Sequence, residues 1–299
     1  MNKIKLRCEI DGQTLEELLD ENNISRKLRR SLKAKGAIKK DDKVLYMSYK
    51  LKKGDIVTLY SDEDNSDIMP VEMPIKVMYE DENILVIDKD YNLSCMSTMN
   101  RNEICLINGI QHYLLNKGIK SKVHLINRLD RLTTGLMLTS LNRYSASMMS
   151  DSLKETLIRK YYAIVHGHLT EKEGTIELKI AKENTMTVRR VVRNDGKIAI
   201  TKYQVVKEFG DYSLLEIELL TGRTHQIRVT FSYIGHPLVG DKMYNHNAGD
   251  NELMLHSHYI EFINPKTNEL IKLDTGLPDR FKEFIKNHEW KRNNQEEFK

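Results

Sequence analysis

From Ile75 onward the chain consists mainly of short strand-like runs, and these constrain the fold more than any other feature of the sequence. Apolar residues alternate or cluster in these runs over roughly four to eight residues. Helical periodicity is expected in only a few places, chiefly Cys105 to Asn116, Arg143 to Leu153 and Pro278 to Lys286. The strands do not alternate regularly with helices, as a doubly wound parallel sheet requires. The sequence therefore predicts an α+β fold with a mostly antiparallel sheet.

The N-terminal part of the chain has a different pattern. Two short amphipathic helices are expected at Leu15 to Leu19 and Ile24 to Leu32, and strand-like runs follow them. The next stretch, SDEDNSDIMPVEMP, is acidic and polar and contains two prolines, which is typical of an extended linker. We therefore predict a small α/β module over residues 1–62, an acidic linker over residues 63–74 and a larger domain over residues 75–299.

The second expected helix carries charge of a single sign. Between Ser25, a plausible N-cap, and Lys35 there are six cations and no acidic residue. Such cations repel each other unless phosphate groups neutralise them, and the alternative is a merely solvated cationic face. The net charge of +4 is too small to decide between the two. We expect phosphate contacts from Arg26, Lys27, Arg29, Arg30 and Lys33.

Three later segments place charged residues in apolar, strand-like surroundings. They are NRLDRLTTGLML (127–138), RKYYAIVHG (159–167) and LLTGRTHQIRV (219–229). Asp130 in the first segment is flanked by leucines, so it needs a nearby cation to stay ionised. Candidates for that cation are Arg128, Arg131, Arg223 and Arg228. The alternative is a turn or helix-cap carboxylate, which the following Thr-Thr-Gly sequence also favours.

In this order the segments resemble the large family of RNA pseudouridine synthases that modify ribosomal large-subunit RNA and transfer RNA. RLDRLTTGLML resembles the family's RLD-x-x-T-[ST]-G-L-L-L, KYYAIVHG resembles K-Y-x-A-x-V-x-G, and TGRTHQIRV matches TGRTHQIRVH. GHPLVGDKMY and LHSHYIEFINP resemble later segments of the family, and the resemblance covers nearly the whole chain. Over about residues 13 to 60, ISRKLRRSLKAKGAI followed by LKKGDIV resembles the alpha-L RNA-binding motif.

The resemblance implies an isomerase that acts on RNA, with a catalytic domain of the pseudouridine synthase type behind an RNA-binding module. It implies that Asp130 is the catalytic aspartate, Tyr161 the active-site tyrosine and Arg228 the partner of the carboxylate. It also implies that Arg128 enters the RNA stack as the target nucleotide leaves, with a plain phosphate contact as the alternative. Support of the active site and of the RNA backbone is expected from Arg223, Thr224, His225 and Gln226, for which the alternative is hydrogen bonding at a sheet edge or turn.

The expected chemistry breaks the glycosidic bond of uridine, turns the uracil and rejoins it through carbon 5. A carboxylate can assist as a nucleophile on the uracil ring or on the sugar, or by stabilising positive charge on the ribose. No redox change or phosphate transfer occurs, so we expect no cofactor. We also expect no metal, because His256 and His258 are typical of ordinary sheet histidines and have no third ligand at a recognisable spacing. Cys8, Cys95 and Cys105 show no CxxC spacing and are expected to be reduced and structural.

Two other classes of protein compete with this interpretation. One is a catalytically silent RNA-binding factor for ribosome assembly, and the other is a carboxylate-dependent RNA hydrolase, which would need a second acid or a metal cluster near Asp130. The sequence has no apolar run of the ~18 to 20 residues that a membrane span needs and no typical secretion signal. We expect a cytoplasmic monomer whose partner is RNA.

Several positions depart from the family pattern. The usual lysine-proline-x-glycine stretch is here Lys89-Asp90-Tyr91-Asn92, and three frequent histidines are replaced by Met96, Asn127 and Thr230. Proline and glycine fix a turn that the present residues must form differently. The departures therefore put loop shape and substrate identity in doubt.

Overall fold

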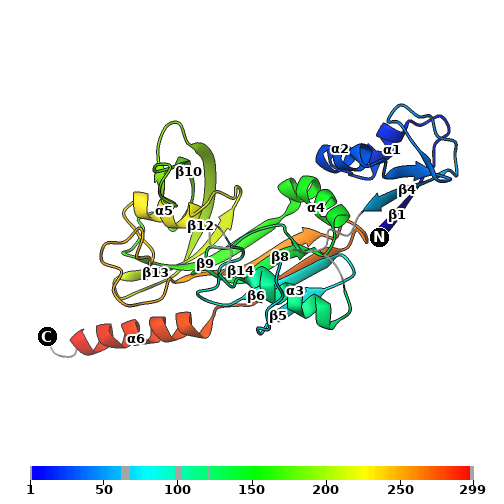
Figure 1. Cartoon of the computed structure of the whole chain (residues 1–299). Coiled ribbons are helices and arrows are strands. Elements are labelled where there is room, and N and C mark those ends of the chain that lie inside the picture. Colours follow the sequence, from blue (N-terminus) through cyan, green and yellow to red (C-terminus); the bar gives the residue numbers. More distant parts are fainter. Residues whose placement is uncertain (1, 62–67, 98–102, 120–121, 297–299) are drawn as a thin grey trace.

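The computed structural model describes residues 2–61, 68–97, 103–119 and 122–296. These residues form a small N-terminal sheet with two helices and one long sheet with four helices (Figure 1). The small sheet lies beside one end of the long sheet, and the last helix extends away from the other end (Figure 1). Within the described residues no helix is long and apolar enough to cross a membrane.

The N-terminal module has a hydrophobic core of its own. Its elements are β1 (Asn2–Arg7), α1 (Leu15–Glu21), α2 (Arg26–Ala34), β2 (Ile38–Lys40), β3 (Lys43–Val44) and β4 (Ile56–Ser61). The strands pair in the order β1-β4-β2-β3, and leucines of both helices pack on them. Thr14 and Glu17 form a capping box at the start of α1, and the Ser25 hydroxyl caps α2 as predicted by accepting from the Leu28 N–H.

The long sheet confirms the predicted α+β class with a mostly antiparallel sheet. In the described part of the chain its strands are β5 (Lys76–Glu80), β6 (Ile84–Lys89), β7 (His124–Leu125), β8 (Thr134–Ser140), β9 (Ile158–His166), β10 (Glu173–Lys182), β11 (Arg190–Val192), β12 (Lys197–Phe209), β13 (Tyr212–Leu219), β14 (Leu255–Ile263) and β15 (Leu270–Asp274). They run in the order β11-β10-β12-β13-β9-β14-β8-β6-β5, with β15 beside β14 and β7 beside β8. Among these pairs only β8 and β14 are parallel.

The parallel pair depends on a glycine close to the candidate site. Gly135 has a φ of +109°, and a Cβ at this position would lie 2.2 Å from the Ser257 carbonyl oxygen. Any larger residue would therefore push β14 away from β8 and be strained in its backbone. Gly135 thus sets how closely the two strands approach directly after the loop that contains Asp130.

Three of the four helices on the long sheet confirm the sequence predictions, and the fourth corrects one. The predicted helices are α3 (Leu106–Asn116), α4 (Arg143–Thr156) and α6 (Asp279–Glu296). The segment 219–229, expected in strand-like surroundings, instead leaves β13 at Leu219 and enters α5 (Gln226–Tyr233). All residues from Gln226 to Phe231 are buried, and only the C-terminal end of the helix at Tyr233 is exposed, so these six residues present no polar face to water. In the sequence, Ile, Val and Phe alternate with polar residues in this segment, which is the pattern typical of a strand.

Only the second half of the predicted linker can be placed. Residues 63–67 lie outside the described part of the chain, and residues 68–75 have no regular secondary structure. They pack against α3: Asn108 Nδ2 donates to the Met69 carbonyl, the Val71 N–H donates to the Asn108 carbonyl, and the Met73 side chain lies against Gly109. This half of the linker is therefore held on the domain that follows it.

The two histidines of β14 lie in the sheet as expected. His256 is buried between the hydroxyls of Thr134 and Thr275, at 2.7 and 2.8 Å. Burial lowers the pKa of His256 from its ordinary 6.5 to about 4, so the ring is neutral near pH 7. His258 stacks on Tyr162 and lies between the carboxylates of Glu216 and Asp274. Both rings thus have protein partners that support the sheet.

Candidate active site

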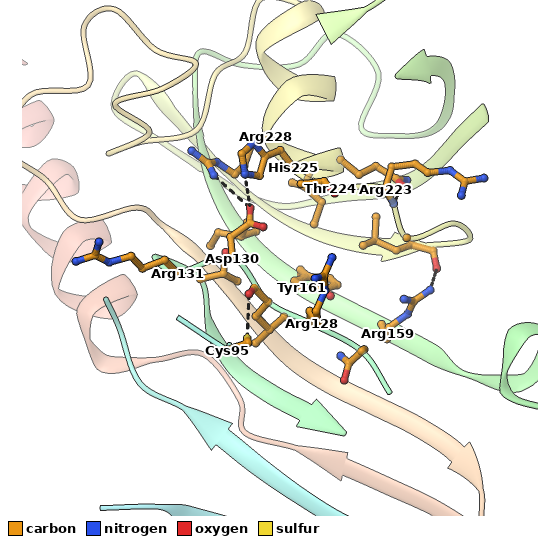
Figure 2. A pocket seen from close by; sticks show the side chains of 18 of the residues that line it. Cys95, Arg128, Asp130, Arg131, Arg159, Tyr161, Arg223, Thr224, His225 and Arg228 are labelled. Carbon is orange, nitrogen blue, oxygen red and sulfur yellow. Dashed lines mark hydrogen bonds and ion pairs between the residues drawn. The ribbon is translucent and has the colours of Figure 1, made fainter. Parts of the chain in front are cut away.

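The three residues expected to carry the chemistry lie together. Asp130 lies in the loop between β7 and β8, Tyr161 on β9 and Arg228 on α5. All three line one cavity of about 620 Å³ (Figure 2). Strands β9 and β13 are neighbours, and Tyr161 pairs with Ile217 near the end of β13. The loop that follows β13 therefore begins close to Tyr161. The sheet topology thus joins segments that are far apart in the sequence.

Two buried side chains hold the loop that carries Asp130. The Cys95 thiol donates to the Leu129 carbonyl at 3.1 Å. The Lys89 ammonium donates to the Arg131 carbonyl at 3.1 Å and to the Leu93 carbonyl at 2.9 Å. Lys89 is only 1% exposed, and this burial lowers its pKa to about 8. The backbone on both sides of Asp130 is therefore fixed from the β6 side of the sheet.

Arg228 joins two carboxylates. Its Nη1 donates to Asp130 Oδ2 at 3.2 Å, while its Nε and Nη2 donate to the two oxygens of Asp241 at 2.8 and 2.7 Å. Burial lowers the pKa of Arg228, but the hydrogen bonds and charge of Asp241, together with the charge of Asp130, outweigh burial and raise it above its ordinary value. The guanidinium is thus a permanent cation that is paired with both carboxylates.

His225 adds a neutral imidazole ring on the same side. It has a φ of +56° and directly precedes α5, and its Nε2 lies 3.7 Å from Asp130 Oδ2. The Tyr244 hydroxyl accepts from the Arg190 N–H and lies 2.9 Å from His225 Nδ1. The hydroxyl can therefore donate to Nδ1, which leaves the ring proton on Nε2, facing Asp130. Burial lowers the pKa of His225, with the Asp130 charge opposing it.

Tyr161 is a buried phenol at the floor of the cavity. Its side chain is 5% exposed, and β9 places it between Ile217 of β13 and Ser257 of β14. Burial raises the pKa of Tyr161 above its ordinary value of 10, so it keeps its proton at neutral pH. A protonated phenol in this place can donate a hydrogen bond or pack against a base.

The other predicted contact residues fall into two groups. Arg128, Arg223 and Thr224 line the cavity and are exposed, so they can reach an RNA strand. Gln226 is 2% exposed, and its amide accepts from Thr221 and the Arg223 N–H and donates to Ile200 and Thr201. Gln226 therefore holds the turn before α5, which is the alternative role considered for it and leaves no group free for RNA.

The structure also accounts for most of the departures from the family pattern. Asn92 has a φ of +56°, the left-handed conformation that glycine favours and asparagine tolerates, and its Oδ1 accepts from Arg131 Nε. Met96 Sδ lies 3.9 Å from Arg128 Nη1. Asn127 is buried and accepts from the Leu138 N–H at 2.7 Å. The turn after Lys89 thus forms without proline or glycine.

Asp241 and Tyr244 are site residues that the sequence patterns did not indicate. Both lie in GHPLVGDKMY, a segment noted only for its order in the chain. Asp241 is fully buried, and its Oδ1 also accepts from the N–H groups of Met243 and Tyr244. An acid inside a Gly-Asp-Lys sequence resembles an exposed turn, so nothing local indicated its burial.

Comparisons with known proteins show the family to which the chain belongs. A family model described as RNA pseudouridylate synthase matches residues 83–233. A Bacillus subtilis (strain 168) protein named uncharacterized RNA pseudouridine synthase YjbO is 34% identical over 278 residues, covering 91% of this chain and 98% of its own. Ribosomal large subunit pseudouridine synthase D of Blochmanniella floridana is 31% identical over 241 residues, covering 74% of this chain and 75% of its own.

The solved structures show the same fold. Human RNA pseudouridylate synthase domain containing 1 superimposes with a TM-score of 0.58 at 24% identity, covering 69% of this chain and 84% of its own. The family match spans the segments that supply Asp130, Tyr161 and Arg228. The chain therefore belongs to the RNA pseudouridine synthase family and is an isomerase whose substrate is RNA.

Proposed function

We propose that this enzyme isomerises specific uridines in ribosomal large-subunit or transfer RNA, with Asp130 as its essential carboxylate. One observation carries the proposal: Asp130, its side chain 25% exposed, faces the cavity while buried Arg228 holds it at 3.2 Å. An ionised carboxylate that is partly desolvated and directed at a ligand cavity is suited to attack an electron-poor carbon or to stabilise positive charge.

The residues around Asp130 support the steps of the reaction. Asp130 assists cleavage of the glycosidic bond as a nucleophile or by stabilising charge on the ribose. Arg228 keeps its oxygen in place with His225 beside it, and Tyr161 donates a hydrogen bond or packs against the freed uracil as it turns. Carbon 5 then bonds to carbon 1′ of the ribose, the hydrogen on carbon 5 leaves as a proton and nitrogen 1 gains a proton, so that the isomer keeps every atom of uridine. If Asp130 has bonded to carbon, that bond breaks in the same sequence and the carboxylate is regenerated.

The charge of the cavity fits a nucleic acid. Among the described residues that line it, Asp130 is the only acid, whereas six are arginines: Arg128, Arg131, Arg159, Arg190, Arg223 and Arg228. A uridine in folded RNA must rotate out of its stack, which costs a few kcal/mol, to reach a carboxylate in a cavity. Arg128 is exposed at the cavity and can fill the space that the nucleotide leaves.

The choice of RNA is proposed from the relatives. Several of them carry the name ribosomal large subunit pseudouridine synthase D. The test is to map pseudouridine in total RNA from cells with and without this gene. We expect one or a few sites to lose the modification when the gene is deleted and to regain it on complementation. An unchanged map would leave the chain as a silent RNA-binding factor.

We propose that the N-terminal module is an alpha-L-type RNA-binding module and that α2 provides its phosphate contacts. Arg26, Lys27, Arg30 and Lys33 are exposed and form no ion pair with any described residue. Arg29 is different, since its guanidinium is buried and bonded to Asp20 and to the Ile24 carbonyl. Arg29 therefore holds α1 and α2 together and is left out of the proposed contacts.

The module is docked so that α2 lies beside α4. The Ser147 hydroxyl of α4 accepts from the Ser25 N–H at 2.9 Å and donates to the Ser25 hydroxyl at 2.6 Å. Tyr144 of α4 also packs on the hydrophobic core of the module. These contacts hold the start of the basic helix in a fixed place relative to the long sheet.

Replacing the four exposed cations of α2 by glutamine should weaken RNA binding and flatten its dependence on salt. Each phosphate that the variant no longer neutralises lowers the steepness of log affinity against log salt by about 0.7 to 0.9, so the loss of all four contacts should lower it by about 3 to 4 units. The measurement is the dissociation constant for a large-subunit ribosomal RNA transcript over a series of salt concentrations.

The control variant removes the same number of charges from lysines that are already paired. Each of these lysines forms an ion pair with a carboxylate outside α2: Lys76, Lys172, Lys207 and Lys266. Their replacement by glutamine should change the slope by less than about 1 unit. Equal slopes for the two variants would exclude a specific phosphate-binding role for α2.

A further inference from the structure

Two arginines of the cavity have no role in the reaction outlined above. Arg159 is at the start of β9, two residues before Tyr161, and Arg190 is the first residue of β11. Both line the cavity and are half-buried. In Figure 2 Arg159 lies on the far side of Tyr161 from Asp130. Arg159 lies in a segment that the sequence patterns indicated, but they assigned no role to either arginine.

Neither arginine has a carboxylate partner among the described residues. The guanidinium of Arg159 makes one long contact, from Nη2 to the Leu219 carbonyl at 3.5 Å. Arg159 Nε and Arg190 Nη1 are buried donors for which no described group supplies an acceptor. A buried N–H without an acceptor is unfavourable, so a ligand that accepts a hydrogen bond from it is bound more tightly.

Neighbouring backbone and side-chain groups hold both arginines at the cavity. A Cβ at Gly222 would lie 3.1 Å from Arg159 Nη1, so the guanidinium rests directly on the backbone of the turn before α5. The Arg190 N–H is held by the Tyr244 hydroxyl, the same group that orients His225. Burial raises the pKa of Tyr161 while the Arg159 charge opposes the rise.

We propose that Arg159 and Arg190 form phosphate-binding positions within the cavity, where they hold the phosphate groups that flank the target uridine. Guanidinium groups bind phosphate oxygens in pairs of hydrogen bonds and remain charged at any physiological pH. Fixing the phosphates on the two sides of a nucleotide fixes its ribose, and this positions the glycosidic bond against Asp130. This inference rests on the proposed function, because the proposed function identifies the ligand as a uridine within an RNA strand.

Small nucleotides test the inference directly. The probes are uridine, uridine 5′-monophosphate and uridine 3′,5′-bisphosphate, titrated against the full chain and followed by protein-detected NMR. We expect the bisphosphate to bind at least about tenfold more tightly than uridine. Arg159→Gln and Arg190→Gln should each lower the affinity for the bisphosphate by about tenfold and leave the affinity for uridine within about twofold.

Arg193→Gln is the matched control. Arg193 follows β11 directly but is already paired with Asp195 and does not line the cavity. This variant should keep the preference for the bisphosphate. The inference is overturned if Arg159→Gln and Arg190→Gln keep that preference too, or if they weaken uridine and bisphosphate equally, as a loss of packing would.

Two further controls distinguish a loss of phosphate binding from a folding defect and from failure of the proposed function. Thermal unfolding is recorded for each variant, and a glutamine variant that does not fold is replaced by the lysine variant, which keeps the charge without the planar fork and should bind the bisphosphate more weakly than the wild type. Binding requires no turnover. A protein that prefers the bisphosphate through these arginines but forms no pseudouridine in RNA would therefore refute the proposed function alone.

Discussion

Asp130→Asn should lower pseudouridine formation by about a thousandfold or more while changing the affinity for RNA by no more than a few fold. The amide has nearly the same shape as the carboxylate, but it can neither attack carbon nor stabilise a developing positive charge. Arg228 stays in place in this variant because two of its three hydrogen bonds to carboxylates go to Asp241. The measurement is the pseudouridine level at the mapped site in cells that carry only the variant, with RNA binding measured on the purified protein.

Asp195→Asn provides the control, since Asp195 is an exposed carboxylate that is also paired with an arginine but lies outside the cavity. It should behave as the wild type in both assays. Retained turnover by Asp130→Asn would show that another group carries the reaction. Loss of RNA affinity together with turnover would instead give Asp130 a structural role.

Arg228→Met should destabilise the fold by about 3 to 5 kcal/mol and also abolish activity. Methionine roughly fills the volume but leaves Asp241, which is 0% exposed, without its bidentate cation. Removing one partner of a buried ion pair leaves an uncompensated charge in the interior, which is one of the costliest single changes in a protein. The free energy of unfolding from urea titrations of the wild type and the variant measures this effect.

The double variant Arg228→Met with Asp241→Asn separates the two effects. Replacing the acid by a neutral amide removes the buried charge, so most of the lost stability should return. Activity should not return, because Asp130 still lacks the guanidinium that holds its oxygen. A single variant as stable as the wild type would show that Asp241 does not depend on Arg228.

The sequence predicted the elements of this fold well where their patterns are local. The serine cap and the leucine face of α2 lie within one short run of neighbouring residues, and the helical periodicity of α3 and α4 is equally local. The prediction failed at α5, whose residues from Gln226 to Phe231 are buried on every side. An amphipathic pattern exists only where one face meets water, so a fully enclosed helix cannot be distinguished from a strand by periodicity.

The interaction partners of charged and polar side chains were the second feature that the sequence could not predict. The sequence of α2 contains no acid, yet Arg29 is bonded to Asp20 of α1. The carboxylate that binds Arg228 most closely lies in a segment that gave no sign of burial, and Gln226 was expected to contact RNA but holds the turn before α5. Such pairings depend on which groups the fold brings within about 3 Å of each other.

By itself the sequence determined the class of the fold, the family and the choice of Asp130 as the residue to test. These three conclusions depend only on patterns within short runs of neighbouring residues. The family resemblance implied that Arg228 pairs with Asp130, 98 positions away, whereas the residues alone left four candidate arginines. Only the tertiary structure decided that Asp241 anchors Arg228 and that Arg159 and Arg190 face the same cavity. Hydrophobic periodicity is a property of adjacent residues, whereas charge pairing in a buried site depends on packing between strands that are distant in the chain.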